Sequence, residues 1–386
     1  MKLKYLLIIG GTICLPSSIH AVDIKGLTAG GLATAAESVN KEETALTLSG
    51  TMNAADFSYI LDNFNHLQSL DLSGVKIADY AGANLPYTGM SHSPAATLPP
   101  YSLTGLATLK SVKLPAELTA IGKGAFSGTG ITSIDIPSGV EEIGAYAFMR
   151  CNSLETANVP ASVKSIGERA FAYCDKLITV NVVEKSDLTE LSEGLFEASA
   201  ISRLDLKNLT DCVEIEPWAL AECNKLETIT LPASMEDIGD YAMSGNKALK
   251  EIHAEDIAAI PTLGENVWHN VNQSAVRLIV PDKMVDDFNA QLQWKEFDII
   301  GVNDNVNAIR SEVSGTGLPL LSVSRQGDVI IAEADNPLHQ INVYNVAGFC
   351  IARKYTDKST AEFNISGWST GVYLIVCEAG VAKISI

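Results

Sequence analysis

An internal period of 22 to 26 residues dominates this sequence and restricts what it can fold into. Each unit holds a strand-like segment of the form L-x-x-I-x-I-P, then an Ile-Gly pair and then an Ala-Phe pair. The clearest Ala-Phe pairs are Ala125-Phe126, Ala147-Phe148 and Ala170-Phe171. A single unit of this size cannot bury its own apolar face, so we expect successive units to stack as coils around one continuous core.

Each part of the unit has a physical role in such a coil. Apolar residues at alternate positions place one face of a short strand inward. The proline ends that strand because it has no N–H to donate to a ladder, and the glycine lets the chain turn at positive φ. The phenylalanine of each unit can then stack on that of the next in the interior.

The period is not uniform along the chain. Units between residues 177 and 224 lose the proline and the Ile-Gly pair, and residues 80–100 form an insertion. A cleaner copy returns at Ile238-Gly239 and Ala242-Met243. We therefore expect a solenoid with irregular coils in its middle.

Composition excludes several classes of function. The 386 residues include 27 Lys and Arg against 46 Asp and Glu, a formal net charge of −19. We expect no nucleic-acid partner, because affinity for nucleic acid comes largely from clustered Lys and Arg. With 47% hydrophobic residues the chain is too apolar to be disordered. Its six histidines leave little material for a histidine-based metal site.

The first 21 residues have the form of a secretory signal peptide. Lys2 and Lys4 precede an apolar run from Tyr5 to Leu15, and the small residue Ala21 suits cleavage by signal peptidase. No later stretch approaches the roughly 20 apolar residues that span a lipid bilayer. We therefore expect an exported protein with no integral membrane segment after signal removal.

After residue 302 the period disappears and short segments of alternating polarity replace it. These segments cover residues 329–332, 341–346, 350–355, 361–365, 372–377 and 382–386. Turn residues such as Gly348 and Gly367 lie between them. Such a series predicts a small β-sandwich.

The sequence resembles two known families. The unit L-x-x-I-x-I-P-x-x-V-x-x-I-G-x-x-A-F-x-x-C resembles the BspA-like leucine-rich repeats of bacterial surface proteins, most of all around Phe126, Phe148, Phe171 and Met243. Residues 46–77 and 277–300 resemble the caps of exported Bacteroidales members. The stretches 343–348 and 371–374 and the final residues 383–386 resemble the C-terminal sorting domains of the Por, or type IX, secretion route.

The expected fold is therefore mainly β, a leucine-rich-repeat solenoid followed by a small C-terminal antiparallel β-sandwich. We expect a signal peptide over residues 1–21, an N-terminal cap over 22–66, the repeats over 67–256 and a C-terminal cap over 257–301. Residues 302–386 then form the sandwich that resembles a sorting domain.

Six cysteines follow the signal peptide, which is sparse for a disulfide framework. Cys151, Cys174 and Cys223 share one repeat phase. In other units the same place is taken by Thr129, Ser199 and Asn246. Small side chains at this phase favour buried thiols over bridges. Two pairings stay open: Cys151 with Cys174 in neighbouring coils, and Cys350 with Cys377 on two strands of the sandwich.

The sequence predicts no catalytic residues, no metal site and no cofactor. Adjacent carboxylates at Glu141-Glu142 and Glu236-Asp237 are of the kind used in acid–base chemistry. Both pairs occupy one repeat phase, which indicates a solvent-facing edge of the coil instead. The histidines show no metal-ligand spacing, and there is no nucleophile elbow, phosphate loop or zincin motif.

The candidate binding surface is the outer side of the stacked strands, where two positions per coil point away from the core. The candidate residues are Lys113, Ser133, Asp135, Thr156, Asn158, Thr179, Asn181, Arg203, Asp205, Thr228 and Thr230. Such a stack is the usual binding surface of solenoids. The alternative, that these side chains only solvate a flat sheet and form stabilising ladders, stays open.

The family resemblance implies a non-enzymatic protein at the cell surface, associated with the outer membrane, or outside the cell. It implies adhesion to a host or bacterial surface protein or glycan. Two other functions stay open: a glycan-binding module of the cell surface, and a structural or assembly scaffold that contacts only its own kind.

Overall fold

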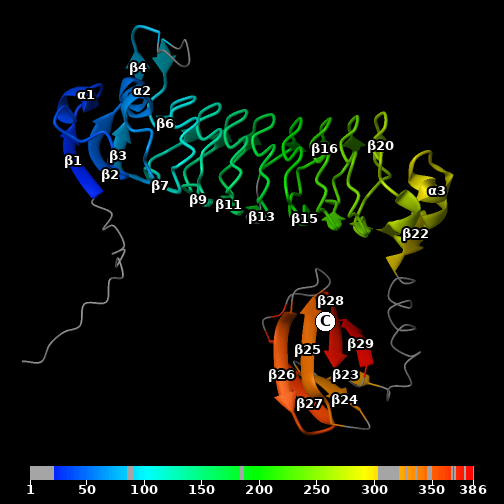
Figure 1. Cartoon of the computed structure of the whole chain (residues 1–386). Helices are drawn as coiled ribbons and strands as arrows, with labels where there is room; N and C mark the ends of the chain where they lie inside the picture. The colour runs from blue at the N-terminus through cyan, green and yellow to red at the C-terminus, as the bar shows by residue number, and fades with distance from the viewer. Residues whose placement is uncertain are drawn as a thin grey trace, which may run out of the picture. The chain divides into compact units, whose positions relative to one another are not determined.

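The computed structural model describes residues 21–84, 91–182 and 187–302, and in the C-terminal region residues 321–326, 329–334, 337–345, 350–366, 368, 371–377 and 380–385. The chain divides into two compact units, Met1–Ile299 and Ile300–Ile386. Figure 1 shows the first as a row of coils and the second as a pair of small sheets. The predicted signal peptide lies outside the described residues except for its last residue, Ala21, which begins the first strand.

Stacking begins earlier than the repeat pattern indicated. The strands β1 (Ala21–Leu27), β2 (Ala45–Met52) and β3 (Ser69–Ile77) pair in parallel, and β3 continues to β7 (Ser111–Lys113). The helices α1 (Leu32–Ala35) and α2 (Ala54–Asn63) connect the first three strands. The segment expected to form the N-terminal cap thus contains β2 and nearly all of β1.

A buried carboxylate holds this N-terminal region together. Asp56, in the first turn of α2, is 1% exposed and accepts hydrogen bonds from the backbone N–H groups of Gly30, Leu32 and Asn53, each at 2.8 Å. Asn53 caps the same helix by accepting from the N–H of Ala55. Three charge-assisted hydrogen bonds compensate the burial of the carboxylate and tie the loop before α1 to α2.

The insertion forms a separate small element beside the coils. The strands β4 (Tyr80–Ala81) and β5 (His92–Ser93) pair antiparallel. The regular coils resume at β6 (Thr97–Leu98). This agrees with the loss of the period over residues 80–100.

The coils carry two rows of short parallel strands, visible along the two long edges of the solenoid in Figure 1. After β7, the first row consists of β9 (Ser133–Asp135), β11 (Thr156–Val159), β13 (Thr179–Val182), β15 (Arg203–Asp205), β17 (Thr228–Thr230) and β19 (Glu251–His253). After β6, the second row consists of β8 (Ala120–Ile121), β10 (Glu142–Ile143), β12 (Ser165–Ile166), β14 (Glu190–Leu191), β16 (Glu214–Ile215), β18 (Asp237–Ile238) and β20 (Thr262–Leu263).

The rows are not hydrogen-bonded from end to end. In the first row, β7 belongs to the sheet of β1, β2 and β3, whereas β9, β11 and β13 form a second sheet and β15, β17 and β19 belong to a third. The second row divides between β12 and β14. Both rows therefore change sheet within the irregular middle units, where the sequence loses its proline and Ile-Gly pair.

A ladder of phenylalanine rings fills the interior, as the Ala-Phe pairs predicted. Phe126 stacks on Phe148 with centroids 5.1 Å apart, and Phe148 stacks on Phe171 at 5.0 Å. Phe171 continues to Phe196 at 5.8 Å. All four rings are buried, so each contributes both apolar burial and ring contacts between coils.

The cysteines that share one repeat phase are buried thiols. Cys151, Cys174 and Cys223 are fully buried and unbridged. Each Sγ donates to the backbone carbonyl of the preceding coil's phenylalanine, at 3.1 Å to Phe126, 3.2 Å to Phe148 and 3.1 Å to Phe196. Asn246 donates from the same phase to the carbonyl of Leu220. The carbonyls of Phe126, Phe148 and Phe196 also accept the backbone N–H groups of Thr129, Cys151 and Ser199, so each thiol adds a second hydrogen bond to a buried carbonyl.

An aromatic cluster closes the C-terminal end of the solenoid. Its elements are η1 (Gln273–Ala275), β21 (Arg277–Val280), η2 (Asp282–Met284), α3 (Val285–Ala290), η3 (Trp294–Glu296) and β22 (Asp298–Gly301). Trp294 is 1% exposed, packs against Phe288 and Phe297, and donates from its indole N–H to the carbonyl of Pro261. The last coil's apolar face is thus covered.

The second unit contains two antiparallel sheets, as predicted. One holds β23 (Ser322–Gln326), β24 (Val329–Glu333) and β27 (Thr360–Asn364). The other holds β26 (Cys350–Thr356), β25 (His339–Asn345), β28 (Val372–Cys377) and β29 (Gly380–Ser385), in that order. Cys350 and Cys377 lie on the two strands that flank β25. The structure does not describe the side chain of Cys350, so the predicted pairing of these two cysteines falls outside the described residues.

Candidate functional site

The first-row strands present the candidate residues on one surface, which we call the strand face. Parallel pairing places Thr156 between Ser133 and Thr179, and Asn158 between Asp135 and Asn181. Arg203 and Asp205 on β15 lie opposite Thr228 and Thr230 on β17. Lys113 stands at the end of β7, opposite Asp71 on β3. The threonines of β11 and β17 are half-buried, and the other candidate side chains are exposed.

Amide side chains form a hydrogen-bonded row at the centre of the strand face. Nδ2 of Asn158 donates to Oδ1 of Asp135 at 3.1 Å, and Nδ2 of Asn181 donates to Oδ1 of Asn158 at 2.9 Å. An amide has two N–H donors and a carbonyl with two lone pairs. This row uses one donor of each amide, so the side chains are held in place and still have capacity to bind a partner.

The N-terminal part of the strand face is stabilised by an ion pair. Nζ of Lys113 lies 2.9 Å from Oδ2 of Asp71, and the hydroxyls of Ser111 and Ser69 are 3.1 Å apart on the neighbouring column. Partial burial alone would raise the pKa of Asp71, but hydrogen bonds from Ser73 and Lys113 hold this pKa below its ordinary value. The amino group of Lys113 is therefore already paired with Asp71 within the protein.

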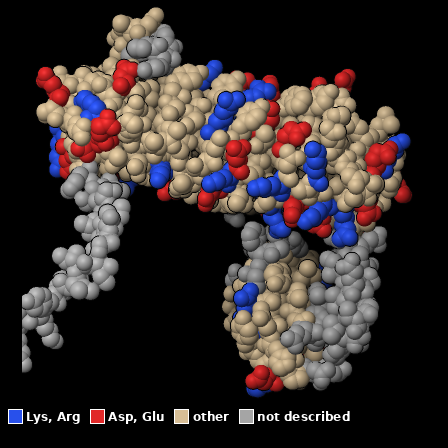
Figure 2. All heavy atoms as spheres, in the orientation of Figure 1, with Lys and Arg blue, Asp and Glu red and all other residues tan. Residues whose placement is uncertain are grey.

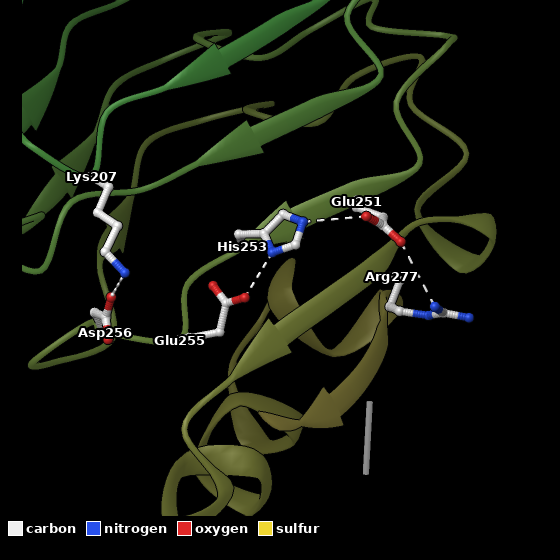
Figure 3. Close-up of polar contacts among 6 residues, drawn as sticks. All are labelled: Lys207, Glu251, His253, Glu255, Asp256 and Arg277. Carbon is white, nitrogen blue, oxygen red and sulfur yellow. Dashed lines mark hydrogen bonds and ion pairs between the residues drawn. The ribbon is translucent and has the colours of Figure 1, made fainter. Parts of the chain in front are cut away.

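A charged network occupies the C-terminal end of the strand face (Figure 3). Nδ1 of His253 lies 2.7 Å from Oε1 of Glu255, and its Nε2 lies 3.2 Å from Oε2 of Glu251. Arg277 on β21 approaches the other oxygen of Glu251 at 3.7 Å. Lys207 and Asp256 form a separate pair beside it, at 2.7 Å. The imidazole is held between two carboxylates on the surface of the sheet.

The network fixes the charge of its histidine. Burial alone would lower the pKa of His253, but the bonds to Glu251 and Glu255 raise it to about 9. The bond from His253, with the nearby charge of Arg277, lowers the pKa of Glu251. The ring is therefore an imidazolium at neutral pH, and the group is an ion-pair network with no neutral imidazole available as a base.

The candidate residues chosen from the sequence do not include this network. Glu251 and His253 continue the two outward columns, but Glu255, Arg277, Lys207 and Asp256 lie outside the repeat pattern. The sequence could have indicated part of this network through the spacing of Glu251, His253 and Glu255, because alternate residues of an extended segment lie on the same side. The partnership with Arg277 depends on the pairing of β19 with β21.

Carboxylates gather on the second row as well. Glu190, Glu214 and Glu216 each place an oxygen within 4.8 Å of the others, a spacing that could hold a cation. Burial, with repulsion from Glu216, Asp237 and Glu190, raises the pKa of Glu214. The adjacent pairs Glu141-Glu142 and Glu236-Asp237 are exposed at the same edge, as their repeat phase indicated.

A third row follows the second-row strands, at the turn that precedes the phenylalanine. We call it the turn row, and its members are Tyr101, Gly124, Tyr146, Arg169, Gly194, Trp218, Tyr241 and Asn266, all with positive φ. A left-handed backbone costs a side-chain-bearing residue roughly 1–2 kcal/mol, which glycine avoids. Four aromatic residues nevertheless stand here, and the sequence reasoning did not select them. They could have been found from the sequence, because each lies two residues before the repeat position that holds the core phenylalanine in the regular coils.

Coils with two strand rows and a stacked phenylalanine core define the chain as a leucine-rich-repeat protein. Residues 96–212 and 143–275 match the family model described as the BspA type leucine rich repeat region, in six copies. Residues 325–385 match the secretion system C-terminal sorting domain. The protein is therefore a BspA-type leucine-rich-repeat protein with a sorting domain, and it is exported to the cell surface. Neither matching model describes a catalytic domain.

Several solved structures are similar to this chain. A leucine-rich repeat protein from Bacteroides ovatus is 21% identical, with 60% of this chain and 58% of that chain covered and a TM-score of 0.43. The Treponema pallidum leucine-rich repeat protein is 21% identical over 52% and 74% of the two chains, with a TM-score of 0.35. A leucine-rich cell surface protein from Faecalibacterium prausnitzii is 19% identical over 64% and 85%, with a TM-score of 0.27.

No curated protein matches the chain. Within the described residues, no helix has the length and apolar character needed to cross a membrane.

Proposed function

We propose that the strand face is an adhesive surface that binds a host or bacterial surface macromolecule, with a surface protein as the favoured partner. The observation that carries this proposal is the row of exposed side chains Asp135, Asn158 and Asn181, which hydrogen bonds hold in register across three coils. Binding would use many weak polar contacts along the sheet and no single pocket.

Preorganisation supports this reading over simple solvation of the sheet. Immobilising a polar side chain on binding costs about 0.5–1.5 kcal/mol. The side chains of the amide row lose much of their freedom already on folding, because they are hydrogen-bonded to one another. A partner that bonds to the remaining donors and acceptors therefore encounters a rigid surface. The charged network around His253 extends the same surface toward β21 with both signs of charge, which favours a partner with complementary polar groups.

The direct test is a binding screen of the protein lacking residues 1–21 against purified extracellular-matrix proteins, a glycan array and the protein itself. For a ligand found in this way, replacing Asp135, Asn158 and Asn181 together by Ala should reduce affinity by tenfold or more. Glu142→Ala with Ser165→Ala, on neighbouring second-row strands, is the matched control and should leave affinity unchanged. Unchanged affinity in the triple variant would exclude the strand face as the binding surface.

The same screen separates the other functions. Binding confined to the glycan array would favour a cell-surface glycan module, and binding confined to the protein itself would favour an assembly scaffold. Either result would replace adhesion to a surface protein as the proposed function.

We further propose that residues 302–386 deliver the solenoid to the surface after residues 1–21 direct its export. Fractionation of cells that produce the full chain or the chain without residues 302–386 tests this. Retention of the shortened chain inside the cell envelope is the expected result, and equal surface display of both would contradict it.

A further inference from the structure

A stacked pair of aromatic rings, one exposed and one half-buried, lies in the turn row, away from the strand face. The rings of Trp218 and Tyr241 stack in parallel, with centroids 4.5 Å apart and an interplanar angle of 6°. Trp218 remains 37% exposed although one face of its indole is covered. It is thus among the few large apolar side chains that the described surface leaves open to solvent.

The turn itself does not explain a tryptophan at this position. The same left-handed turn is made by Gly124 and Gly194 in other coils, with no steric cost. Trp218 has a φ of 62°, a left-handed backbone conformation that is unfavourable for a residue with a side chain. Much of its apolar surface is also exposed to water. Stacking on Tyr241 compensates part of this penalty, and the open indole surface remains without a structural role.

The open indole lies in acidic surroundings. Glu216 is two residues before Trp218, and its carboxylate is within 4.8 Å of those of Glu190 and Glu214. Asp240 precedes Tyr241 directly, and its backbone carbonyl accepts the N–H of Trp218 at 3.1 Å. The aromatic pair and the carboxylates therefore come from three consecutive coils, and one oxygen of Glu216 accepts the backbone N–H of Glu193 at 2.7 Å.

Positive charge is largely on the other side of these coils. Over residues 187–245 the Lys and Arg residues are Arg203, Lys207 and Lys225. Arg203 lies on β15 and Lys207 pairs with Asp256 beside the His253 network, so both belong to the strand face. In Figure 2, Lys and Arg side chains gather along the lower edge of the solenoid's C-terminal half, where Figure 1 places β15 and β22. Arg169 does reach toward the acidic side, where Glu193 and Glu197 neutralise it.

We propose that Trp218 and Tyr241, with the carboxylates of Glu190, Glu214 and Glu216, form a second binding surface for an arginine- or lysine-bearing segment of a partner protein. A guanidinium or ammonium group placed over the indole gains a cation–π attraction, and the carboxylates of Glu214 and Glu216, four and two residues earlier in the same coil, attract the same positive charge. This surface is distinct from the strand face, and the inference does not depend on the proposed function.

Charge complementarity favours a cation over a neutral sugar, which also stacks on aromatic rings. Burial raises the pKa of Glu214, and repulsion from Glu216, Asp237 and Glu190 raises it further. A bound cation relieves that repulsion, whereas a neutral sugar leaves it in place. A cationic peptide segment therefore satisfies both the indole and the carboxylates.

The test uses fluorescence anisotropy of labelled hexa-arginine, with labelled hexa-glutamine as the neutral probe, on the full chain at low and at physiological salt. We expect hexa-arginine to bind and to weaken with salt, because exposed charges are screened. Trp218→Gly should weaken binding by about fivefold, and Glu214→Gln with Glu216→Gln by about 3- to 10-fold. Glycine is native at this turn in two other coils, so Trp218→Gly should fold, which circular dichroism checks.

Matched variants separate a built surface from general attraction to an acidic protein. Tyr146→Gly changes the same turn position in a coil where Lys123 lies over the ring, and it should leave affinity unchanged. Glu141→Gln with Glu142→Gln removes the same amount of charge on another coil and should also have no effect. Equal affinity of the native protein and Trp218→Gly would overturn the proposal, as would equal losses in the two charge variants. Binding of a soluble polysaccharide that depends on Trp218, without binding of hexa-arginine, would overturn it in favour of a carbohydrate surface.

Discussion

Nδ2 of Asn181 lies 2.9 Å from Oδ1 of Asn158, one coil away along the solenoid. Asn158 in turn donates to Asp135 on the preceding coil. A repeat that alternates inward and outward residues brings such side chains into line, but only parallel pairing without an offset lets them bond to one another. The bonded row is at once a stabilising ladder and a rigid set of polar groups.

The two roles of this row are separable by Asn158→Ala. The two hydrogen bonds it removes are exposed, so the free energy of unfolding should fall by only about 1 kcal/mol. A surface ligand should bind distinctly more weakly, because Asp135 and Asn181 both lose their partner. Thermal denaturation and titration of the same samples measure both effects. A large loss of stability with unchanged affinity would make the row purely structural.

The phenylalanine ladder should dominate the stability of the central coils. Phe148→Ala removes a ring stacked on both sides and should lower the free energy of unfolding by about 3–5 kcal/mol. Phe148→Leu keeps most of the volume and should cost about 1 kcal/mol. Denaturant unfolding followed by circular dichroism compares them, with Tyr146→Phe as a nearby control. Equal losses in the two Phe148 variants would show that ring volume is not what the core requires.

The network around His253 should make stability depend on pH. The pKa of His253 is about 9 in the folded protein against an ordinary value of 6.5. A raised pKa means that the folded state holds the proton more tightly, so the contribution is complete below about pH 6.5 and is lost as pH rises through 9. The stability difference between native protein and His253→Gln should therefore be on the order of 1–3 kcal/mol at pH 6 and shrink above pH 9.

The exposed His66 supplies the control for this pH series. His66→Gln makes the same chemical change at an exposed position and should show only a small stability difference from the native protein. A His253→Gln difference that stays constant from pH 6 to pH 10 would contradict the charged network.

Buried thiols should resist modification in the folded protein. Burial raises the pKa of Cys151 to about 11 and that of Cys223 to about 12, and it raises that of Cys174 well above the ordinary value. At pH 8 only about one Cys151 thiol in a thousand, and a smaller fraction of Cys223, is then a reactive thiolate. Iodoacetamide followed by peptide mass spectrometry should find these three residues unmodified until denaturant is added. Recovery of a Cys151–Cys174 disulfide peptide would contradict the structure.

Asp56 should be essential for the N-terminal region. Asp56→Ala leaves three buried backbone N–H groups without their acceptor and should lower the free energy of unfolding by about 2–4 kcal/mol. Asp23→Ala, at an exposed position on β1, should change it by less than about 0.5 kcal/mol. Similar losses in the two variants would show that the acceptor role of Asp56 is dispensable.

The agreement between sequence and structure is closest where a single repeat unit contains all the residues on which the prediction depends. The Ala-Phe spacing predicted the ring ladder from Phe126 to Phe171, and the cysteine phase predicted buried thiols, because each position relative to its own strand decides whether it points inward. Where the local pattern is weak, the sequence analysis named no strand. The strand β23, Ser322–Gln326, has Val323 as its sole apolar residue, and β1 and β2 precede the repeat consensus altogether.

The sequence by itself determined the period, the core and the outward columns, since these follow from local alternation of polar and apolar residues. Only the tertiary structure decided which coils share a hydrogen-bonded ladder. It also decided that Arg277 contacts Glu251, that His253 lies between two carboxylates and that Trp218 stacks on Tyr241. These contacts join residues from different coils or from segments outside the repeat. They depend on how far each coil advances and on how its turns are directed, and neither is encoded within a single unit.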